Sequence, residues 1–382
     1  MKNFRSNAEF LDEVRKFSEN CLSPLTREID KTDIIPEVVY SKLTERRLFA
    51  FNSLADGGEE LSAPDRIDTM LRCLTIISET SPAIAKAVMD QNFGQIGMMR
   101  QFGNPTIQGK LENIRAGRKQ AAFLMTEPQS GSELTQFETN FEYTMGGVMI
   151  SGTKDWITGA DRREYFVTLA KEAGTTKNFG LFLIDRGADS SGIKISDRKN
   201  KLGLRGLGEY RVELDRIFVP HEHTVIAPGS GVIAKIMAHY NIKRCGQAAI
   251  SLGTIQAALR SAHSYLQTRF KGEIPFQNTQ FVFADLYSRL SAIRPLPHSA
   301  AIETLAGDSS GVPASIAKYV CTELAVEATT KLAQLCGGNG LSDKLPLERQ
   351  MRDMRMLTVA GGASQVLQTT IARNMERLLQ KA

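Results

Sequence analysis

The spacing of apolar residues changes twice along this chain, and these two changes constrain its fold more than any other feature of the sequence. Up to about residue 114, apolar side chains recur at helical spacing, for example at Phe10, Val14 and Phe17, which is typical of helices with one buried face. Between residues 121 and 225, short β-rich stretches alternate with turns that contain Gly, Asp and Ser. Helical spacing then returns for the rest of the chain. The sequence therefore predicts helices, then strands, then helices.

The individual elements follow from the same patterns. The predicted strands are 147–151, 165–169, 181–184 and 211–214, and the predicted C-terminal helices are 242–268, 279–293, 314–335 and 363–379. Helices of this kind pack naturally as a four-helix unit. We therefore expect a mainly α protein with a central β domain. Its expected parts are an N-terminal helical domain (1–118), a middle β domain (119–227) and a C-terminal helical bundle (228–382).

Composition and charge exclude several classes of protein. No apolar run approaches the roughly 18 residues of a membrane span, and the first ten residues lack the apolar stretch of a signal peptide. We therefore expect a cytoplasmic protein without membrane contact. The five cysteines are scattered and never form a CxxC pair, so neither a disulfide framework nor a metal site is indicated. The net charge of +5 is spread along the chain, which argues against nucleic-acid binding.

Two polar stretches in the β-rich region carry a recognisable pattern. The first, FLMTEPQSGSEL (123–134), places a hydroxyl, a turn-forming proline and a Gly-Ser pair at the edge of the β domain. The second, GTKDWITG (152–159), holds the only tryptophan of the chain. Together they resemble the flavin-binding signature of the acyl-CoA dehydrogenase family, in which TEPxxGS is followed by GxKxWIT. The resemblance implies that family's fold: an N-terminal helical domain, a middle β-barrel-like domain and a C-terminal four-helix bundle.

The resemblance also implies FAD as the cofactor. A flavin ring needs hydrogen-bond donors along the edge that gains negative charge on reduction, and it needs one ring face covered. Thr126 and Thr158 match the family's ring contacts, Trp156 matches the aromatic against the ring, and Ser132 matches the pyrophosphate contact. The predicted set in this domain is completed by Met125, Gly131 and Ile157.

The resemblance continues toward the C-terminus. KLGLRGLGEYRVELDRIFVP (201–220) is similar to the strand pair that closes the family's β domain, and QLCGGNG (334–340) precedes an Arg-Asp pair at the family's spacing. In the family, this glycine turn approaches the FAD of a neighbouring subunit. The resemblance therefore implies a homodimer or homotetramer. It adds a second set of predicted FAD contacts: Arg269, Gln334, Gly337, Gly338 and Gln365.

The catalytic glutamate of the family is missing from both positions where the family places it. After the Arg-Asp pair the run reads AGGASQ (360–365), so Gly361 occupies one position, and Lys243, before Arg244, occupies the other. General-base catalysis commonly contributes about 10²- to 10⁴-fold, and water alone does not remove an unactivated α-proton. A simple saturated acyl-CoA is therefore not the expected substrate. Glu209 is a candidate substitute base, with a solvated loop carboxylate as the alternative.

Three interpretations follow from this loss. In the first, a thioester with a polar hydroxy- or aminoacyl group reduces the flavin without that glutamate, and the Lys243 ammonium pairs with a carboxylate or hydroxyl of the substrate. In the second, the protein is an acyl-CoA dehydrogenase or an enoyl-CoA reductase acting on a small CoA thioester. In the third, it is a catalytically degenerate binding or scaffold protein.

We favour the first interpretation, with the acyl group on an acyl carrier protein in the biosynthesis of a specialised metabolite. The pantetheine arm is common to CoA and carrier proteins, and a positive net charge suits an acidic carrier. The predicted substrate contacts, placed where the family holds that arm, are Tyr240, Asn241, Lys243 and Arg244. The family normally passes electrons to an electron-transfer flavoprotein, which is the expected partner, with oxygen as the open alternative.

Overall fold

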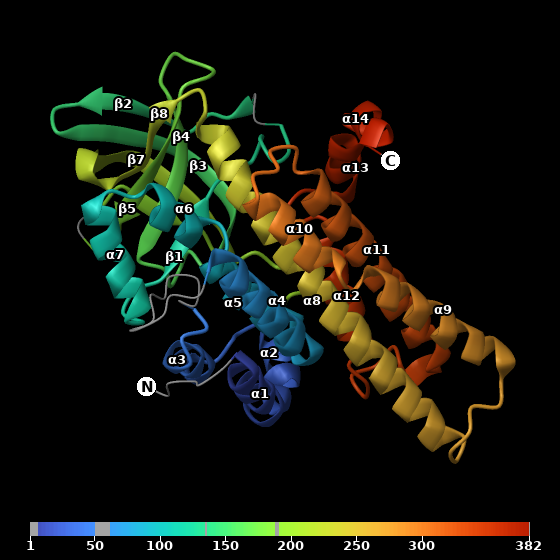
Figure 1. Ribbon diagram of the computed structural model, residues 1–382. Coiled ribbons are helices and arrows are strands. Elements are labelled where there is room, and N and C mark those ends of the chain that lie inside the picture. Colours follow the sequence, from blue (N-terminus) through green and yellow to red (C-terminus); the bar gives the residue numbers. More distant parts are fainter. Residues whose placement is uncertain (1–6, 50–61, 134–135, 188–190, 382) are drawn as a thin grey trace.

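The N-terminal part of the chain is helical. The computed structural model describes residues 7–49, 62–133, 136–187 and 191–381 (Figure 1). Residue 134, the last of the first polar stretch, and residue 382 therefore lie outside the described residues. The N-terminal helices are α1 (Asn7–Phe17), α2 (Thr26–Thr32), α3 (Glu37–Glu45), α4 (Ala63–Thr80), α5 (Pro82–Asn92), α6 (Gln95–Phe102) and α7 (Pro105–Arg115). A π-helical turn (Ser18–Leu22) and a 3₁₀ turn (Ser23–Leu25) join α1 to α2.

Capping side chains set the start of three of these helices. Ser62, Ser81 and Asn104 each accept a hydrogen bond from the N–H three residues later, at 3.1–3.3 Å, and a proline follows each cap within two positions. Such caps satisfy N–H groups that the helix itself leaves without partners. The second of these helices, α5, is buried along its whole length and packs against α4, α6 and α8 (Val232–Arg269).

The middle of the chain forms one mixed sheet. Its strands are β1 (Ala121–Leu124), β2 (Asn140–Thr144), β3 (Gly147–Thr158), β4 (Tyr165–Glu172), β5 (Phe179–Asp185), β6 (Ile193–Ile195), β7 (Glu209–Pro220) and β8 (Thr224–Gly229). They are ordered β6-β7-β3-β2-β4-β5-β8, with β1 parallel to β4. Along β4, Tyr165, Val167 and Leu169 join a core with α6 and α7, whereas Phe166 and Ala170 join the core on the other face, as the period-2 geometry of a strand requires.

The C-terminal part is again helical and continues the core of the N-terminal helices. Its elements are α8, α9 (Gln277–Ile293), α10 (Leu296–Leu305), α11 (Val312–Leu335), a 3₁₀ turn (Gly337–Asn339), α12 (Leu347–Leu357), α13 (Ser364–Ala372) and α14 (Met375–Lys381). α8 packs against both α4 and α11. Gly253 permits the close approach of α4, because an added Cβ would lie 2.1 Å from the carbonyl oxygen of Thr75. One hydrophobic core therefore runs through both helical parts.

The Arg-Asp pair of α12 connects the three parts of the molecule. Arg352 donates to both carboxylate oxygens of Asp30 in α2, at 2.9 and 2.7 Å. Asp353 accepts the backbone N–H of Leu204, in the segment before β7. The pair at this point of the sequence thus has a structural role, since it fixes α12 against both α2 and the β domain.

The predicted order of helices, strands and helices is confirmed, and so is the predicted fold class. Four details of the C-terminal part differ from the prediction, and the first is that α8 begins at residue 232 rather than at residue 242. Helices α10 and α12 were not predicted, since prolines at 295 and 297 obscure the start of α10 and α12 is strongly polar. The predicted helix 363–379 is two helices, interrupted at residues 373–374. No helix in the described part of the chain is long and apolar enough to cross a membrane.

Candidate active site

A buried ion pair joins the two polar stretches of the β domain. Lys154 in β3 donates to Glu127 in the loop after β1 at 2.9 Å, and neither side chain is exposed. Glu127 also accepts the backbone N–H groups of Glu138 and Thr139, at 2.6 and 3.1 Å. Burial lowers the pKa of Lys154 to about 7, which the Glu127 carboxylate opposes. The motif carboxylate therefore holds the loop in place, and it is not available to a substrate.

A bulge in β3 turns the tryptophan outward. The pairing of β3 with β7 changes register between Lys154 and Ile157, and Trp156 within this interruption has a φ of +57°. Ile157 points into the core, whereas the Trp156 side chain is 50% exposed. Bulges commonly re-aim a side chain in this way. The large flat ring of Trp156 is thus presented at the surface of the sheet beside Lys199, whose ammonium lies 5.1 Å from the ring centroid.

Thr158 and Glu209 lie opposite each other at the ends of β3 and β7. The Thr158 hydroxyl lies 2.9 and 3.1 Å from the two carboxylate oxygens of Glu209. The sequence-based alternative for Glu209, a solvated loop carboxylate, is wrong, because the residue is partly buried and begins a strand. Burial raises the pKa of Glu209 to about 7, against the lowering effect of the Lys86 cation. Glu209 can therefore hold and release a proton near neutral pH.

These residues fit the flavin that the sequence motifs imply. An exposed aromatic ring and a threonine hydroxyl lie two residues apart on β3, and the Asp155 N–H donates to the carbonyl of Thr126 at 2.8 Å, which brings the first motif beside them. Gly131 has nothing within 4 Å of an added Cβ, and Ser132 is exposed. Thr126, Thr158 and Trp156 would hold the ring, with Ser132 on the pyrophosphate.

Four of the five residues in the second predicted FAD-binding set, all except Gln365, lie at the far end of the helical bundle. Arg269 ends α8, a helix of 38 residues that is about 57 Å long and begins beside the β domain (Figure 1). The glycine turn lies at this same end, because Asn339 bonds to the hydroxyl of Tyr265. Gly337 and Gly338 both have open space where a Cβ would be. Within one chain, the structure does not bring this set together with Trp156.

The remaining members of the sequence-predicted sets lie in three different parts of the structure. Gln334 is exposed in the last turn of α11, three residues before Gly337, whereas Gln365 is exposed in the first turn of α13 and away from the glycine turn. Met125 is partly buried and packs against the core that contains α6 and α7.

Lys243, at one of the two family base positions, is held by an internal carboxylate. Its ammonium lies 2.9 Å from Asp90 in α5, and Lys86 pairs with the other oxygen of Asp90. Although burial opposes it, the Asp90 carboxylate holds the pKa of Lys243 above its ordinary value. Lys243 is therefore a permanently charged, already paired cation. Sequence reasoning missed Asp90 and Lys86, since no motif links α5 to α8.

The other position, Gly361, faces the side of α8. Gly361 has a φ of +76°, and a Cβ added to it would lie 2.1 Å from Oε1 of Gln247, a fully buried residue of α8. Arg244 donates through Nε to the Gly361 carbonyl at 3.1 Å and through Nη1 to Asn241 at 2.9 Å. Tyr240 lies alongside, with its ring centroid 5.8 Å from the Arg244 guanidinium. Tyr240, Asn241 and Arg244, three of the predicted substrate contacts, therefore lie together beside Gly361.

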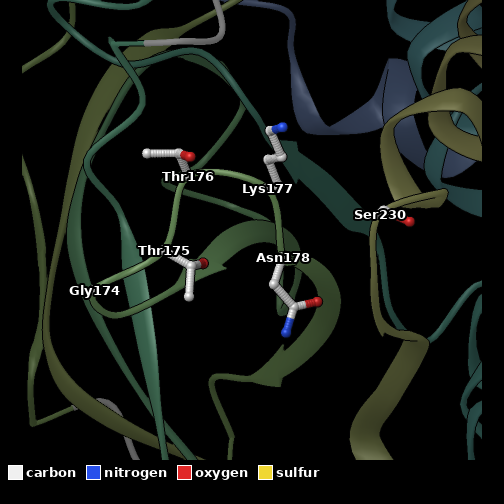
Figure 2. A pocket seen from close by; sticks show the side chains of 6 residues that line it. All are labelled: Gly174, Thr175, Thr176, Lys177, Asn178 and Ser230. Carbon is white, nitrogen blue, oxygen red and sulfur yellow. The ribbon is translucent and has the colours of Figure 1, made fainter.

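An open pocket of about 530 Å³ lies elsewhere, at the turn between β4 and β5 and the start of α8. Figure 2 shows its lining residues, which are Gly174, Thr175, Thr176, Lys177, Asn178 and Ser230. None of the sequence-predicted site residues lines this pocket. Ser230 nevertheless stands two residues before α8, the helix that carries Tyr240 to Arg244.

The chain matches known proteins along most of its length. Residues 122–217 and 230–376 match the family models described as acyl-CoA dehydrogenase, middle domain, and acyl-CoA dehydrogenase, C-terminal domain. The chain is 30% identical over 366 residues to a 3-sulfinopropanoyl-CoA desulfinase of Paraburkholderia xenovorans, covering 94% of this chain and 93% of that protein. It is 28% identical over 372 residues to the benzylmalonyl-CoA dehydrogenase of Aromatoleum aromaticum, covering 95% and 96%. The solved structure of butyryl-CoA dehydrogenase from Megasphaera elsdenii matches with a TM-score of 0.89 at 23% identity, covering 98% and 99%.

Proposed function

Because the chain belongs to the acyl-CoA dehydrogenase family and is therefore an FAD-dependent oxidoreductase acting on thioesters, we propose that it oxidises a thioester with a polar acyl group. The observation that carries this proposal is the absence of a free carboxylate at both base positions. Lys243 is paired with Asp90, and Gly361 faces the amide of Gln247. FAD, when bound, supplies a hydride acceptor at flavin N5. The chain must then position a substrate that releases hydride without a glutamate at these positions.

Polar residues surround the place where such a substrate would react. Asn241, Arg244 and Gln247 come from one stretch of α8, and Lys243 lies on the same helix. Lys243, Arg244 and Asn241 already have partners within the chain. An unsubstituted alkyl chain would leave the Gln247 amide, which makes no hydrogen bond within the described residues, without one, which is unfavourable. Two of the relatives support a polar acyl group, since their names specify a sulfinopropanoyl and a benzylmalonyl thioester. Both names denote acyl groups that bear an acidic substituent.

Glu209 is the residue that we assign to proton exchange. Its partly buried carboxyl contacts Thr158, a predicted flavin contact, and its pKa of about 7, which results from burial, lets it hold a proton at neutral pH. In this role Glu209 would hold a proton at the Thr158 hydroxyl rather than at the position of the family's glutamate. Charged groups around it are Lys86 and Asp90 on α5 and Lys201 before β7.

The carrier of the acyl group is the finer part of the proposal. We place the substrate on an acyl carrier protein, in the biosynthesis of a specialised metabolite, with CoA as the alternative. The pocket beside Ser230 would receive the polar end of either carrier, because it lies about 15 Å along α8 from Tyr240 and contains the Lys177 cation. Electrons would leave through an electron-transfer flavoprotein.

A homodimer or homotetramer is part of the same proposal. The Trp156 region and the Gly337-Gly338 turn lie at different ends of the chain's helical bundle, so one FAD would bind between the Trp156 region of one subunit and the Gly337-Gly338 turn of another.

The test is an anaerobic titration of the purified holoprotein, followed by its visible flavin absorbance. Hydroxyacyl, aminoacyl and saturated acyl thioesters are offered on CoA and on a carrier protein. Bleaching of the flavin by polar thioesters alone supports the proposal. Bleaching by these thioesters only when they are attached to the carrier protein supports an acyl carrier protein, rather than CoA, as the carrier of the substrate. Bleaching by butanoyl-CoA at a comparable rate would refute the polar substrate. Flavin that no thioester reduces, but that an enoyl thioester reoxidises after reduction with dithionite, would assign a reductase instead.

A further inference from the structure

Gln247 is a fully buried side chain whose amide has no partner at either end. It lies in α8, and neither its Nε2 nor its Oε1 makes a hydrogen bond within the part of the chain that the structure describes. Buried polar side chains in folded proteins are nearly always hydrogen-bonded. A buried polar group without a partner loses its hydrogen bonds to water and gains no hydrogen bond within the protein, which is destabilising. A complete amide group left in this state indicates that its partner is supplied from outside the chain.

The amide faces the reaction site. An added Cβ at Gly361 would lie 2.1 Å from Oε1 and 2.7 Å from Nε2 of Gln247, so the amide directly adjoins this glycine. Arg244 holds the Gly361 turn against α8 through its bond to the Gly361 carbonyl. In the family this position carries the base that reaches the acyl carbons next to the thioester. A ligand that satisfies Gln247 would therefore be a substituent on those carbons.

The charges around Gln247 restrict what that substituent can be. Lys243 precedes it by four residues, on the same face of α8. Arg244 lies beside it, and the Lys318 ammonium donates to the carbonyls of Thr358 and Gly362 at 3.1 and 2.8 Å. The nearby carboxylates are Asp90, which two lysines share, and Glu323, which accepts a hydrogen bond from Ser364. Burial lowers the pKa of Lys318 to about 7, but Lys86, Lys243 and Arg244 still outnumber the two carboxylates, so the surroundings carry a net positive charge.

We infer that Gln247 determines substrate specificity by binding an oxygen-bearing substituent, a hydroxyl or an acid group, near the thioester of the acyl chain. An oxygen accepts a hydrogen bond from Nε2, and a hydroxyl also donates to Oε1, which satisfies both ends of the amide. An ammonium can donate only to Oε1, and the cations Lys243 and Arg244 repel it. This inference rests on the proposed function. Of the hydroxyacyl and aminoacyl substrates proposed above, it favours those whose substituent carries oxygen and disfavours the aminoacyl ones.

Binding of four matched CoA thioesters to the oxidised holoprotein tests this role without requiring turnover. The probes are butanoyl-CoA, 3-hydroxybutanoyl-CoA, succinyl-CoA and β-alanyl-CoA, and the dissociation constants come from calorimetry and from the shift of the flavin band. In the wild type, 3-hydroxybutanoyl-CoA or succinyl-CoA should bind about tenfold or more tightly than butanoyl-CoA and β-alanyl-CoA. The two oxygen-bearing probes show whether a hydroxyl or an acid is preferred.

The variant Gln247→Met keeps the length of the side chain and removes its hydrogen bonds. It should abolish the preference for oxygen-bearing probes while leaving butanoyl-CoA binding unchanged or tighter. Gln247→Leu serves if the methionine variant does not fold. Gln350→Leu, at a buried glutamine of α12, is the matched control and should keep the preference.

Several outcomes would overturn the inference. They are tightest binding of β-alanyl-CoA, a preference that survives in Gln247→Met, and an equal loss for all four probes. These outcomes concern Gln247 alone and leave the proposed function standing if polar thioesters still bleach the flavin and butanoyl-CoA does not. If no thioester binds the wild type, the proposed function fails, and the specificity role fails with it.

Discussion

The Lys154 ammonium lies 2.9 Å from the Glu127 carboxylate, and both side chains are completely buried. The two residues belong to different halves of the flavin-binding signature, and the pair explains why those halves occur together in one sequence. Each charge is tolerable in the interior only because the other is present. The loop that carries Thr126 and Ser132 is therefore fixed to β3 by the protein alone.

Glu127→Gln should destabilise the protein strongly. Removing one partner of a buried pair leaves the other charge uncompensated, which typically costs about 3–5 kcal/mol. Urea unfolding at neutral pH measures the loss. Asp12→Asn, at the exposed pair of Asp12 and Lys16, is the control and should cost less than about 1 kcal/mol. An equally small loss of unfolding free energy in both variants would show that groups other than Glu127 stabilise the Lys154 charge.

The sequence predicted those features of the molecule that depend on local patterns. Helical spacing located the longest helices of the C-terminal part, and strand alternation located β3, β4, β5 and β7 but not the other four strands. The outward position of Trp156 fits its place in the motif. Pairings between distant segments carry no such signal. Nothing near Lys243 in the sequence points to Asp90, which lies 153 positions earlier and is brought to it only by the packing of α5 against α8. Gln247 belongs to no motif and became notable only through its missing partners.

Glu209 should make the stability of the protein depend on pH. Burial raises its pKa to about 7 in the folded state, against an ordinary value of 4.5, so the folded state binds a proton that the unfolded state has released in this interval. The stabilisation is fully present below the unfolded pKa and is lost as the pH rises through about 7. The unfolding free energy should thus fall by about 2–3 kcal/mol between about pH 5 and pH 8. Glu209→Gln should flatten this dependence in urea titrations at constant FAD, whereas an unchanged slope would assign it to another group.

Gly361→Glu should not restore the family's usual chemistry. The backbone at this position has a φ of +76°, and the new Cβ would collide with the Gln247 amide. Strain and overpacking together should cost about 2–5 kcal/mol. Gly109→Glu in α7, where an added Cβ meets nothing within 4 Å, is the control and should be nearly neutral. Adding Gln247→Ala to Gly361→Glu should recover part of the loss. Full stability of the single variant, with rapid bleaching by butanoyl-CoA, would contradict this account.

Trp156→Ala should weaken FAD binding by about tenfold or more and leave the fold intact. The ring is half exposed in the protein alone, so its removal takes little from the core, but a flavin would lose the aromatic surface that covers it. Fluorescence titration of the apoprotein with FAD measures the affinity. Tyr143→Ala, which removes a similarly exposed ring from β2, should leave the affinity unchanged. Equal affinities for both variants would exclude Trp156 from the flavin site.

Mixing two defective variants should restore FAD binding if each site is built from two subunits. Trp156→Ala damages the β-domain side of the site, and Gly338→Glu places a carboxylate in the open space beside the glycine turn. In a mixed dimer, one site combines both lesions and the other has neither. After unfolding and refolding of an equal mixture, about a quarter of all sites should bind FAD normally, because half of the dimers are mixed. The FAD content per chain gives this fraction. If both sets instead serve one chain's own cofactor, every chain keeps a lesion in its own site, and mixing recovers nothing.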